Sequence, residues 1–286
     1  MLLDGGIGTE LEKSGVPMND IMWSAQAMLS HPQNILDMHE SYIRAGAEVI
    51  LTNTFSSARH MLEPAGYGDA VEQINRQAVE IALQARNNLA DGPVAIAGSI
   101  CEWVSTDDEN RDRIDTVRDS LREQAEILMQ AGVDLIAFEM CQAKELSCAS
   151  IEAVLELGLP IWLGVSAQSK SDQSELSVFD YPHRDFESLV QGISGYPAMI
   201  LNVMHTPIQD IDAAVEIVRR HWDGPVGVYP ESGYFTMPNW NFVDVIEPND
   251  LVPLTRGWVD NGVRLVGGCC GLGPAHISAL HDEFKT

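Results

Sequence analysis

Eight short segments of β-branched or apolar residues, separated by stretches of helical periodicity, are the feature that most constrains the fold of this chain. Each segment ends on small or polar residues, as buried strands do. The segments occupy residues 1–6, 48–55, 93–100, 133–140, 160–167, 198–205, 224–232 and 263–271. Between them, apolar residues recur three and four apart, which predicts helices. These helices occupy residues 31–47, 69–90, 113–132, 144–158, 185–194, 208–222, 249–262 and 275–284.

This alternation predicts an α/β fold, a single (β/α)8 TIM barrel, because parallel strands must be joined by covering crossovers. Three predicted helices end in a glycine just before the next strand, at Gly132, Gly158 and Gly262, which is typical of a helix C-cap. A doubly wound open sheet is the alternative. It generally has fewer strands and carries GxGxxG after the first one, where this chain has DGGIGTE. No linker interrupts the pattern, so we expect one domain over residues 1–286.

Charge and cysteine content exclude several classes of protein. The chain has 42 Asp and Glu against 17 Lys and Arg, a net charge of −25 at pH 7, so nucleic acid is a poor partner. No apolar run is long enough to span a membrane. The first residues, MLLDGG, lack the basic and apolar regions of a secretory signal. Five cysteines, an odd number, do not suggest a disulfide framework. We therefore expect a cytoplasmic protein with free thiols or a metal site.

The most specific motif is GGCCG, which ends the last apolar segment and contains Cys269 and Cys270. In a TIM barrel the active site lies at the carboxyl ends of the strands. Adjacent cysteines on a regular strand would point to opposite faces, but the flanking glycines free the backbone so that both sulfurs can face one ion. Two soft ligands from one loop predict zinc. The alternative is two small buried residues that fill the barrel mouth.

Further motifs accompany GGCCG, namely LLDGGIGTELEKSG, MWSAQAML, HESYIRAGAEVILTNTF, AIAGSI, VDLIAFEM and YPESG. Through these motifs the chain resembles the homocysteine S-methyltransferase family over essentially its whole length. The resemblance implies that Zn²⁺ activates the thiol of homocysteine for methyl transfer, giving methionine. A free thiol has a pKa of about 8.5 and is mostly protonated at neutral pH, whereas coordination to zinc deprotonates it. The resulting thiolate attacks the methyl group in line, and no general base is required.

The resemblance implies that Cys269 and Cys270 are two of three zinc ligands. The third in this family is the cysteine of a G-x-N-C segment at the end of strand six. Here that segment reads Ile200–Val203, so the asparagine is kept and the thiolate is missing. A cysteine introduced by Val203→Cys would then be expected to restore a three-thiolate site.

Three explanations for the missing thiolate are open. His205, two residues further on, takes its place; Cys141, just past strand four, supplies it from a neighbouring loop; or the site binds zinc poorly or has been re-purposed. Cys101 and Cys148 are weaker candidates, and Cys148 falls inside a predicted helix.

The resemblance also implies residues that bind the amino-acid substrate. Glu139 ends strand four and would bind the amino group; the alternative is a structural salt bridge, because an unpaired buried charge is costly. Asp4 matches the acid of the family's first strand, and the amides of Gly5 and Gly6 would receive the substrate carboxylate. A tight turn without a ligand is the alternative.

The remaining candidates are polar and aromatic residues near predicted strand ends. Asn53, Thr54 and Asn202 orient the carboxylates or only satisfy backbone groups. Four aromatic residues either offer π faces to a cationic methyl donor or pack in the core: Trp23, Phe55, Tyr229 and Tyr234.

The leading hypothesis is therefore an S-methyltransferase that uses a small onium donor. The donors implied are S-methylmethionine, S-adenosylmethionine, betaine and dimethylsulfoniopropionate, and the acceptor is homocysteine or a related thiol or selenol. The alternative is a non-catalytic barrel that binds an amino acid or onium compound, or a subunit of a methyl-transfer complex with a degraded zinc site. The oligomeric state is open.

Overall fold

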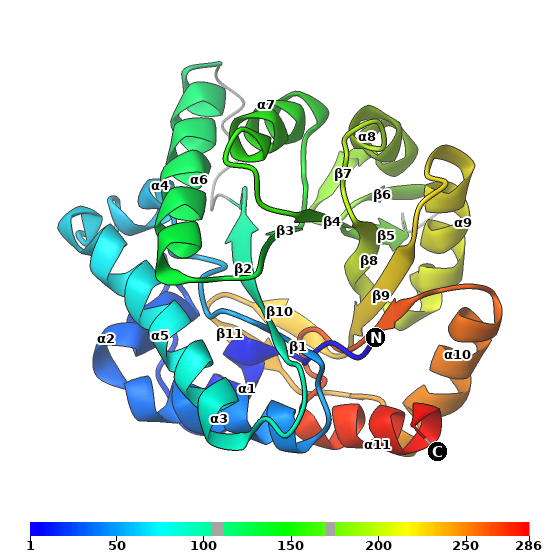
Figure 1. Cartoon of the computed structure of the whole chain (residues 1–286). Coiled ribbons are helices and arrows are strands. Elements are labelled where there is room, and N and C mark those ends of the chain that lie inside the picture. Colours follow the sequence, from blue (N-terminus) through cyan, green and yellow to red (C-terminus); the bar gives the residue numbers. More distant parts are fainter. Residues whose placement is uncertain (104–110, 170–174, 286) are drawn as a thin grey trace.

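A curled parallel sheet of seven strands organises the molecule, with helices along its outer side (Figure 1). The structure is a computed structural model and describes residues 1–103, 111–169 and 175–285. The strand order is β1-β2-β3-β4-β8-β9-β12, and every neighbouring pair is parallel. The strands are β1 Val49–Leu51, β2 Ala95–Cys101, β3 Leu135–Glu139, β4 Ile161–Val165, β8 Ile200–Pro207, β9 Val226–Glu231 and β12 Leu265–Val266. Seven of the eight predicted strands are thus confirmed.

The eighth predicted strand, residues 1–6, forms two isolated bridges instead of a strand. Leu2 bridges Val266 of β12, and Leu3 bridges Val49 of β1, both in the parallel sense. The segment therefore lies between the two end strands of the sheet. Its ladder is short because the chain turns at Gly5 and Gly6 and enters a helix at Ile7.

All eight predicted helices are present, and shorter helices occur between them. The eight are α3 Pro32–Arg44, α5 Val71–Leu89, α6 Arg111–Ala131, α7 Lys144–Leu155, α8 Phe186–Ile193, α9 Ile211–His221, α10 Pro248–Asp260 and α11 Pro274–Phe284. The short ones, α1 Ile7–Lys13, α2 Ala27–Ser30 and α4 Arg59–Leu62, have too few turns for a clear periodic signal. Gly132, Gly158 and Gly262 all have positive φ, as a glycine C-cap requires. In the described ranges, no helix is both long and apolar enough to cross a membrane.

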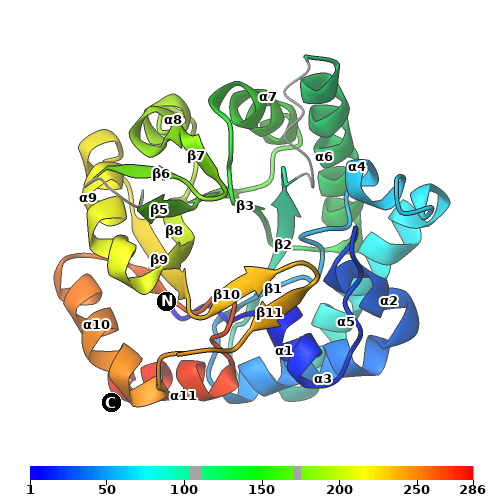
Figure 2. The ribbon, with the colours of Figure 1, turned by 180° about the vertical axis from the view of Figure 1, so that it is seen from behind.

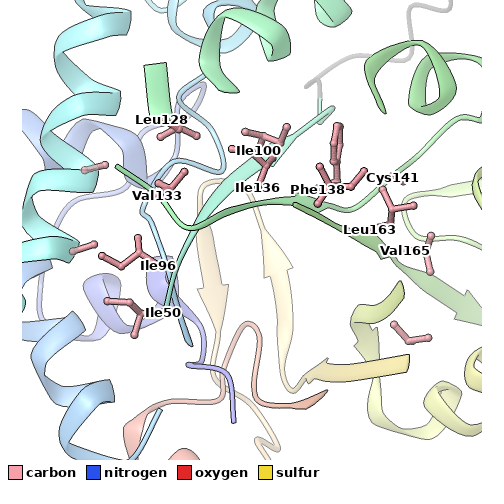
Figure 3. Close-up of a cluster of buried hydrophobic side chains, with 14 of the residues drawn as sticks. Ile50, Ile96, Ile100, Leu128, Val133, Ile136, Phe138, Cys141, Leu163 and Val165 are labelled. Atoms are coloured by element: carbon pink, nitrogen blue, oxygen red, sulfur yellow. The ribbon is translucent and has the colours of Figure 1, made fainter. Parts of the chain in front are cut away.

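Side chains alternate between two apolar clusters on either face of the sheet. An outer cluster lies between strands and helices, and Figure 3 shows part of it, including Ile136 of β3 and Leu128 of α6. An inner cluster takes the other positions of the same strands, such as Leu135 and Ala137. This two-residue period follows from the pleat of a strand, and it decides which residues can reach the interior.

Two antiparallel additions, not predicted from the sequence, follow strands β4 and β9. One is a three-stranded sheet of β5 Ala167–Ser169, β6 Leu176–Val178 and β7 Tyr181–Asp185. The other is the hairpin of β10 Tyr234–Thr236 and β11 Asn239–Asn241, which lies in front of the main sheet in Figure 2. The hairpin is fixed to α1, because the backbone N–H of Trp240 donates to Glu12 Oε2 at 2.9 Å. Both additions lie at the carboxyl ends of the strands.

Candidate active site

A cavity of about 280 Å³ opens at the carboxyl ends of the strands, beneath the β10–β11 hairpin. Its wall combines a cysteine and histidine group, three carboxylates and many aromatic rings. The carboxylates are Glu139, Asp180 and Glu231, and the rings are those of Trp23, Phe55, Trp103, Phe179, Tyr229, Tyr234, Phe235 and Trp240. Within the described ranges, its lining contains neither lysine nor arginine. The cavity is thus apolar in bulk and negative in charge.

Three predicted metal ligands, His205, Cys269 and Cys270, meet in this cavity. Their ligand atoms all lie within 4.8 Å of one another, and Cys269 Sγ is 3.4 Å from His205 Nδ1. His205 comes from β8 and the cysteines follow β12; both strands pair with β9, which brings the two segments together. A spacing of this size suits side chains that share one ion.

An irregularity in β8 brings His205 into the cavity. Met204 belongs to the inner cluster, so regular alternation would turn His205 outward. Instead, the register with β9 shifts between Met204 and Pro207, and His205 has a φ of +42°. A residue other than glycine rarely adopts such a backbone, and extra residues of this kind re-aim side chains next to functional sites. Both Met204 and His205 consequently line the cavity.

The Cys269-Cys270 turn is held by backbone bonds to the end of β9. Cys269 N–H donates to Pro230 O at 2.8 Å, and Ser232 N–H donates to Cys270 O at 3.0 Å. Gly271, which follows the pair, has a φ of +83°, and a Cβ at this position would lie 1.9 Å from Ser232 O. Only glycine fits there. Both cysteines line the cavity, as the glycine argument requires.

The charges of this group depend on one another. The pKa of Cys269 is held well below its usual range by a hydrogen bond from Cys270, with burial opposing and His205 assisting. The pKa of Cys270 is raised because it donates that hydrogen bond and is buried. Burial alone would lower the pKa of His205, but Glu231 and Cys269 outweigh it and raise the value to about 10. Cys269 and His205 therefore favour each other's charged forms.

The donor set fits zinc. Two sulfurs and one imidazole are soft and borderline ligands, and three protein ligands leave a fourth position open, as catalytic zinc sites do. The other cysteine considered, Cys141, packs in the outer cluster and does not join this group. Cys101 Sγ accepts from Trp103 N–H at 3.2 Å, and Cys148 lies in α7. Of the three explanations for the missing thiolate, the structure therefore brings His205, and not Cys141, to the pair.

Glu139 ends β3 and is 7% exposed, with its carboxylate in the cavity. It accepts hydrogen bonds from Ser99 Oγ and from the Tyr229 hydroxyl. Burial, and then the nearby Cys269, raise the pKa of Glu139 to about 8. In the described part of the chain, no ion pair compensates this carboxylate, which speaks against a purely structural salt bridge.

The first-strand residues only partly match what was expected of them. Asp4 is fully buried and does not line the cavity; its Oδ2 accepts from Leu51 N–H at 2.8 Å. Gly5 and Gly6 do line it. In the structure the Gly6 amide donates to Leu272 O at 3.0 Å. Its hydrogen is already used to hold the turn beside the cysteines.

Asn53 lines the cavity, but its side-chain amide forms hydrogen bonds with the segment before α2. Its Oδ1 accepts from Ser24 Oγ at 2.8 Å, and its Nδ2 donates to Ser24 O at 3.1 Å. Thr54 is buried behind the wall and donates to Ser99 O at 2.6 Å. Asn202 is buried as well and donates to Leu163 O at 3.3 Å. All three side chains support the wall.

The aromatic part of the wall comes from three distant segments. Trp23 meets Phe55 and Phe235 edge to face, each with a centroid separation of 6.2 Å. Trp240 lies 6.0 Å from His205 and 6.4 Å from Phe235. The indole Nε1 of Trp23 is buried, and within the described ranges it has no hydrogen-bond partner. A ring edge and an N–H donor are therefore available to a ligand.

Sequence reasoning missed several lining residues, most clearly Glu231, Phe179, Phe235 and Trp240. Glu231 was recognised only as part of the YPESG segment. The other three lie in the additions after β4 and β9, where no long periodic pattern exists. The alternating aromatic residues around Pro238 were the available signal for a hairpin at the cavity mouth.

The parallel α/β sheet thus brings two cysteines and a histidine together in an aromatic cavity as a candidate metal site. A family profile described as homocysteine S-methyltransferase matches residues 1–284, and the chain belongs to this family. The resemblance seen in the motifs is confirmed.

Individual relatives agree with this assignment over nearly their whole length. The selenocysteine Se-methyltransferase of Brassica oleracea var. italica is 28% identical, with 100% of this chain and 89% of that protein covered. The homocysteine S-methyltransferase YbgG of Bacillus subtilis is 28% identical, with coverages of 98% and 93%. The metallated form of the homocysteine methyltransferase MmuM from Escherichia coli superimposes with a TM-score of 0.78 at 26% identity, covering 100% and 96%.

Proposed function

We propose that this protein transfers a methyl group from a cationic onium compound to the thiol of homocysteine, giving methionine, with Zn²⁺ held by His205, Cys269 and Cys270. The observation that carries the proposal is the meeting of these three side chains, with ligand atoms within 4.8 Å, inside an aromatic and acidic cavity. Membership of the homocysteine S-methyltransferase family supports it.

Zinc bound here would lower the pKa of the acceptor thiol and present it as a thiolate. The protein's own part is to keep Cys269 and Cys270 in one place through the bonds to β9 and to bring His205 beside them. The hairpin and the aromatic wall limit water around the reacting sulfur. A less hydrated thiolate is more reactive toward a methyl group on a sulfonium or ammonium centre.

Glu139 is proposed to bind the amino group of homocysteine. Its carboxylate is buried near Cys269 and forms no ion pair among the described residues, so a substrate ammonium would supply a partner of opposite charge. Ser99 and Tyr229 hold the carboxylate in place, and Thr54 holds Ser99. The Gly5 amide is the remaining candidate for the substrate carboxylate, with Asp4 fixing this turn against β1 through Leu51.

The methyl donor is proposed to be a net cation. Trp23, Phe55 and Phe235 bring aromatic rings to the cavity, and the face of such a ring attracts an onium group. The lining contains three carboxylates and, within the described ranges, neither lysine nor arginine, so it favours a donor whose ammonium group leaves it with a net positive charge. We therefore favour S-methylmethionine or S-adenosylmethionine over the zwitterions betaine and dimethylsulfoniopropionate.

We also propose that Leu2 and Leu3 serve as the eighth strand of a closed barrel, since they bridge both β12 and β1. On this view residues 1–286 act as one domain, because the first and last segments of the chain both contribute to the cavity.

The test combines metal analysis with a donor panel. Protein purified without chelators should contain about one zinc per chain. Incubation with homocysteine and each of the four donors should yield methionine, measured by mass spectrometry, fastest with S-methylmethionine or S-adenosylmethionine. Selenocysteine in place of homocysteine tests the selenol acceptor. Zinc-free protein that binds an onium compound in calorimetry but forms no methionine would instead support the non-catalytic binding barrel.

A further inference from the structure

Glu231 is a buried carboxylate in the cavity to which the proposed reaction assigns no role. It is the last residue of β9 and is 5% exposed. Its Oε2 lies 3.1 Å from His205 Nδ1. Among the described residues, the group with mutually close ligand atoms contains His205, Cys269 and Cys270 and does not include Glu231. The carboxylate is therefore placed to act on the histidine, and not as a further member of the group.

The contact between Glu231 and His205 affects the net charge around the proposed ligands. A set of two thiolates and an imidazole carries one negative charge less than the three thiolates that the resemblance implies. The position of the missing cysteine, Val203, packs in the outer cluster, so no ligand can come from there. Glu231 places one negative charge beside the imidazole that stands in for the thiolate.

The geometry also suits a histidine that binds a metal. A carboxylate close to a metal-binding histidine attracts the ring and adds negative charge to the site. His205 Nδ1 lies near two acceptors, Glu231 Oε2 at 3.1 Å and Cys269 Sγ at 3.4 Å. Nδ1 is thus the ring nitrogen that faces the cysteines, and Glu231 Oε2, which makes no hydrogen bond among the described residues, places its charge on this same side of the ring. The φ of +42° at His205 shows that the backbone bends to reach this place.

We infer that Glu231 is a positioning residue that acts through His205, and that the His205–Glu231 pair together replaces the third thiolate of the family. The inference rests on the proposed zinc site and deepens it. The carboxylate holds the imidazole beside the cysteines and restores the negative charge that a set of three thiolates would carry.

The test measures zinc affinity, not activity. Metal-free protein competes with a chromophoric chelator for zinc in five forms: wild type, Glu231→Gln, His205→Ala, the double variant and Asp180→Asn. Glu231→Gln keeps the size of the side chain and should weaken zinc binding about 10- to 100-fold. In the His205→Ala background the same change should have no effect, because the two residues act as one unit. Asp180→Asn is the matched control: this carboxylate lines the same cavity and affects His205 through its charge without an ion-pair contact in the described structure, so its loss should weaken zinc binding much less than Glu231→Gln does.

Each contrary result has a distinct meaning. Wild-type protein that binds no zinc would overturn the proposed function and this inference with it. Wild-type zinc binding combined with equal or tighter binding by Glu231→Gln would overturn the inference alone; tighter binding would show that the ion pair with His205 competes with the metal. Additive effects in the double variant, or an equal loss in Asp180→Asn, would assign the effect to the general negative field of the cavity.

Discussion

Glu139→Gln is expected to stabilise the metal-free protein while weakening the binding of homocysteine. In the folded protein, burial and Cys269 raise the pKa of Glu139 from 4.5 to about 8. The folded state thus binds this proton more tightly than the unfolded state. The favourable contribution is complete below pH 4.5 and is lost as the pH rises toward 8. Linkage gives a cost of about 1 kcal/mol at pH 5 and about 4 kcal/mol at pH 8.

Urea unfolding of wild type and Glu139→Gln at pH 5 and pH 8 measures this cost. The variant should gain about 3 kcal/mol over wild type between the two pH values, because the amide has no charge to bury. Glu216→Gln, in which the side chain is 78% exposed, controls for the amide itself. A difference between wild type and Glu139→Gln that stays the same at both pH values would refute the reasoning, since it would mean that water or a counter-ion already compensates the carboxylate.

Although Glu139→Gln should stabilise the metal-free protein, it should impair the binding of homocysteine. Loss of one charge-assisted hydrogen bond costs about 1.5–3 kcal/mol, so the KM for homocysteine should rise roughly 10- to 150-fold in Glu139→Gln. The KM for the methyl donor should change little. Steady-state assays with each substrate varied in turn separate the two constants. An unchanged KM for homocysteine would make Glu139 a structural residue.

Three further outcomes follow from the site. Cys269→Ala or Cys270→Ala should lose both zinc, measured by elemental analysis, and methyl transfer, while circular dichroism stays native; full activity in either variant would remove the metal assignment. Cys141→Ala should keep stoichiometric zinc, because Cys141 packs in the outer cluster. Trp23→Ala should raise the KM for the donor about 2- to 30-fold through loss of a cation–π contact and leave the KM for homocysteine unchanged; equal changes in both would indicate a collapsed cavity wall.

The parts of the fold that the sequence predicted are those with a local physical signal. Helices such as α5 and α9 show their apolar face directly in the spacing of residues. The strands are visible in the sequence as short apolar runs. Residues 1–6 carried the same signal, but the turn at Gly5 and Gly6 leaves only Leu2 and Leu3 to pair. The hairpin of β10 and β11 has three residues in each strand, too few for a periodic pattern.

The residues of the candidate site also differ in whether a local motif reveals them. Cys269 and Cys270 could be found because they sit in one motif with the glycines that their turn requires. His205 remained one of three possibilities, since its approach depends on an irregularity in β8 that no motif records. Glu231 had no visible role because its partner lies on a different strand. The hydrogen bond of the Gly6 amide could not be foreseen for a similar reason, because its acceptor, Leu272, comes from the other end of the chain.

The variant Val203→Cys distinguishes most directly between β8 as the G-x-N-C motif predicts it and β8 as the structure shows it. The G-x-N-C pattern alone suggests that a cysteine at this position rebuilds a three-thiolate site. In the structure Val203 is fully buried in the outer cluster, facing the helices, while Met204 and His205 line the cavity. A thiol at position 203 therefore points away from Cys269, and turning it inward would move the whole strand by one residue. Val203→Cys should accordingly fail to restore zinc binding in a His205→Ala background, as measured by metal content after dialysis. Stoichiometric zinc in that double variant would show that β8 can rearrange and that its irregularity depends on His205 itself.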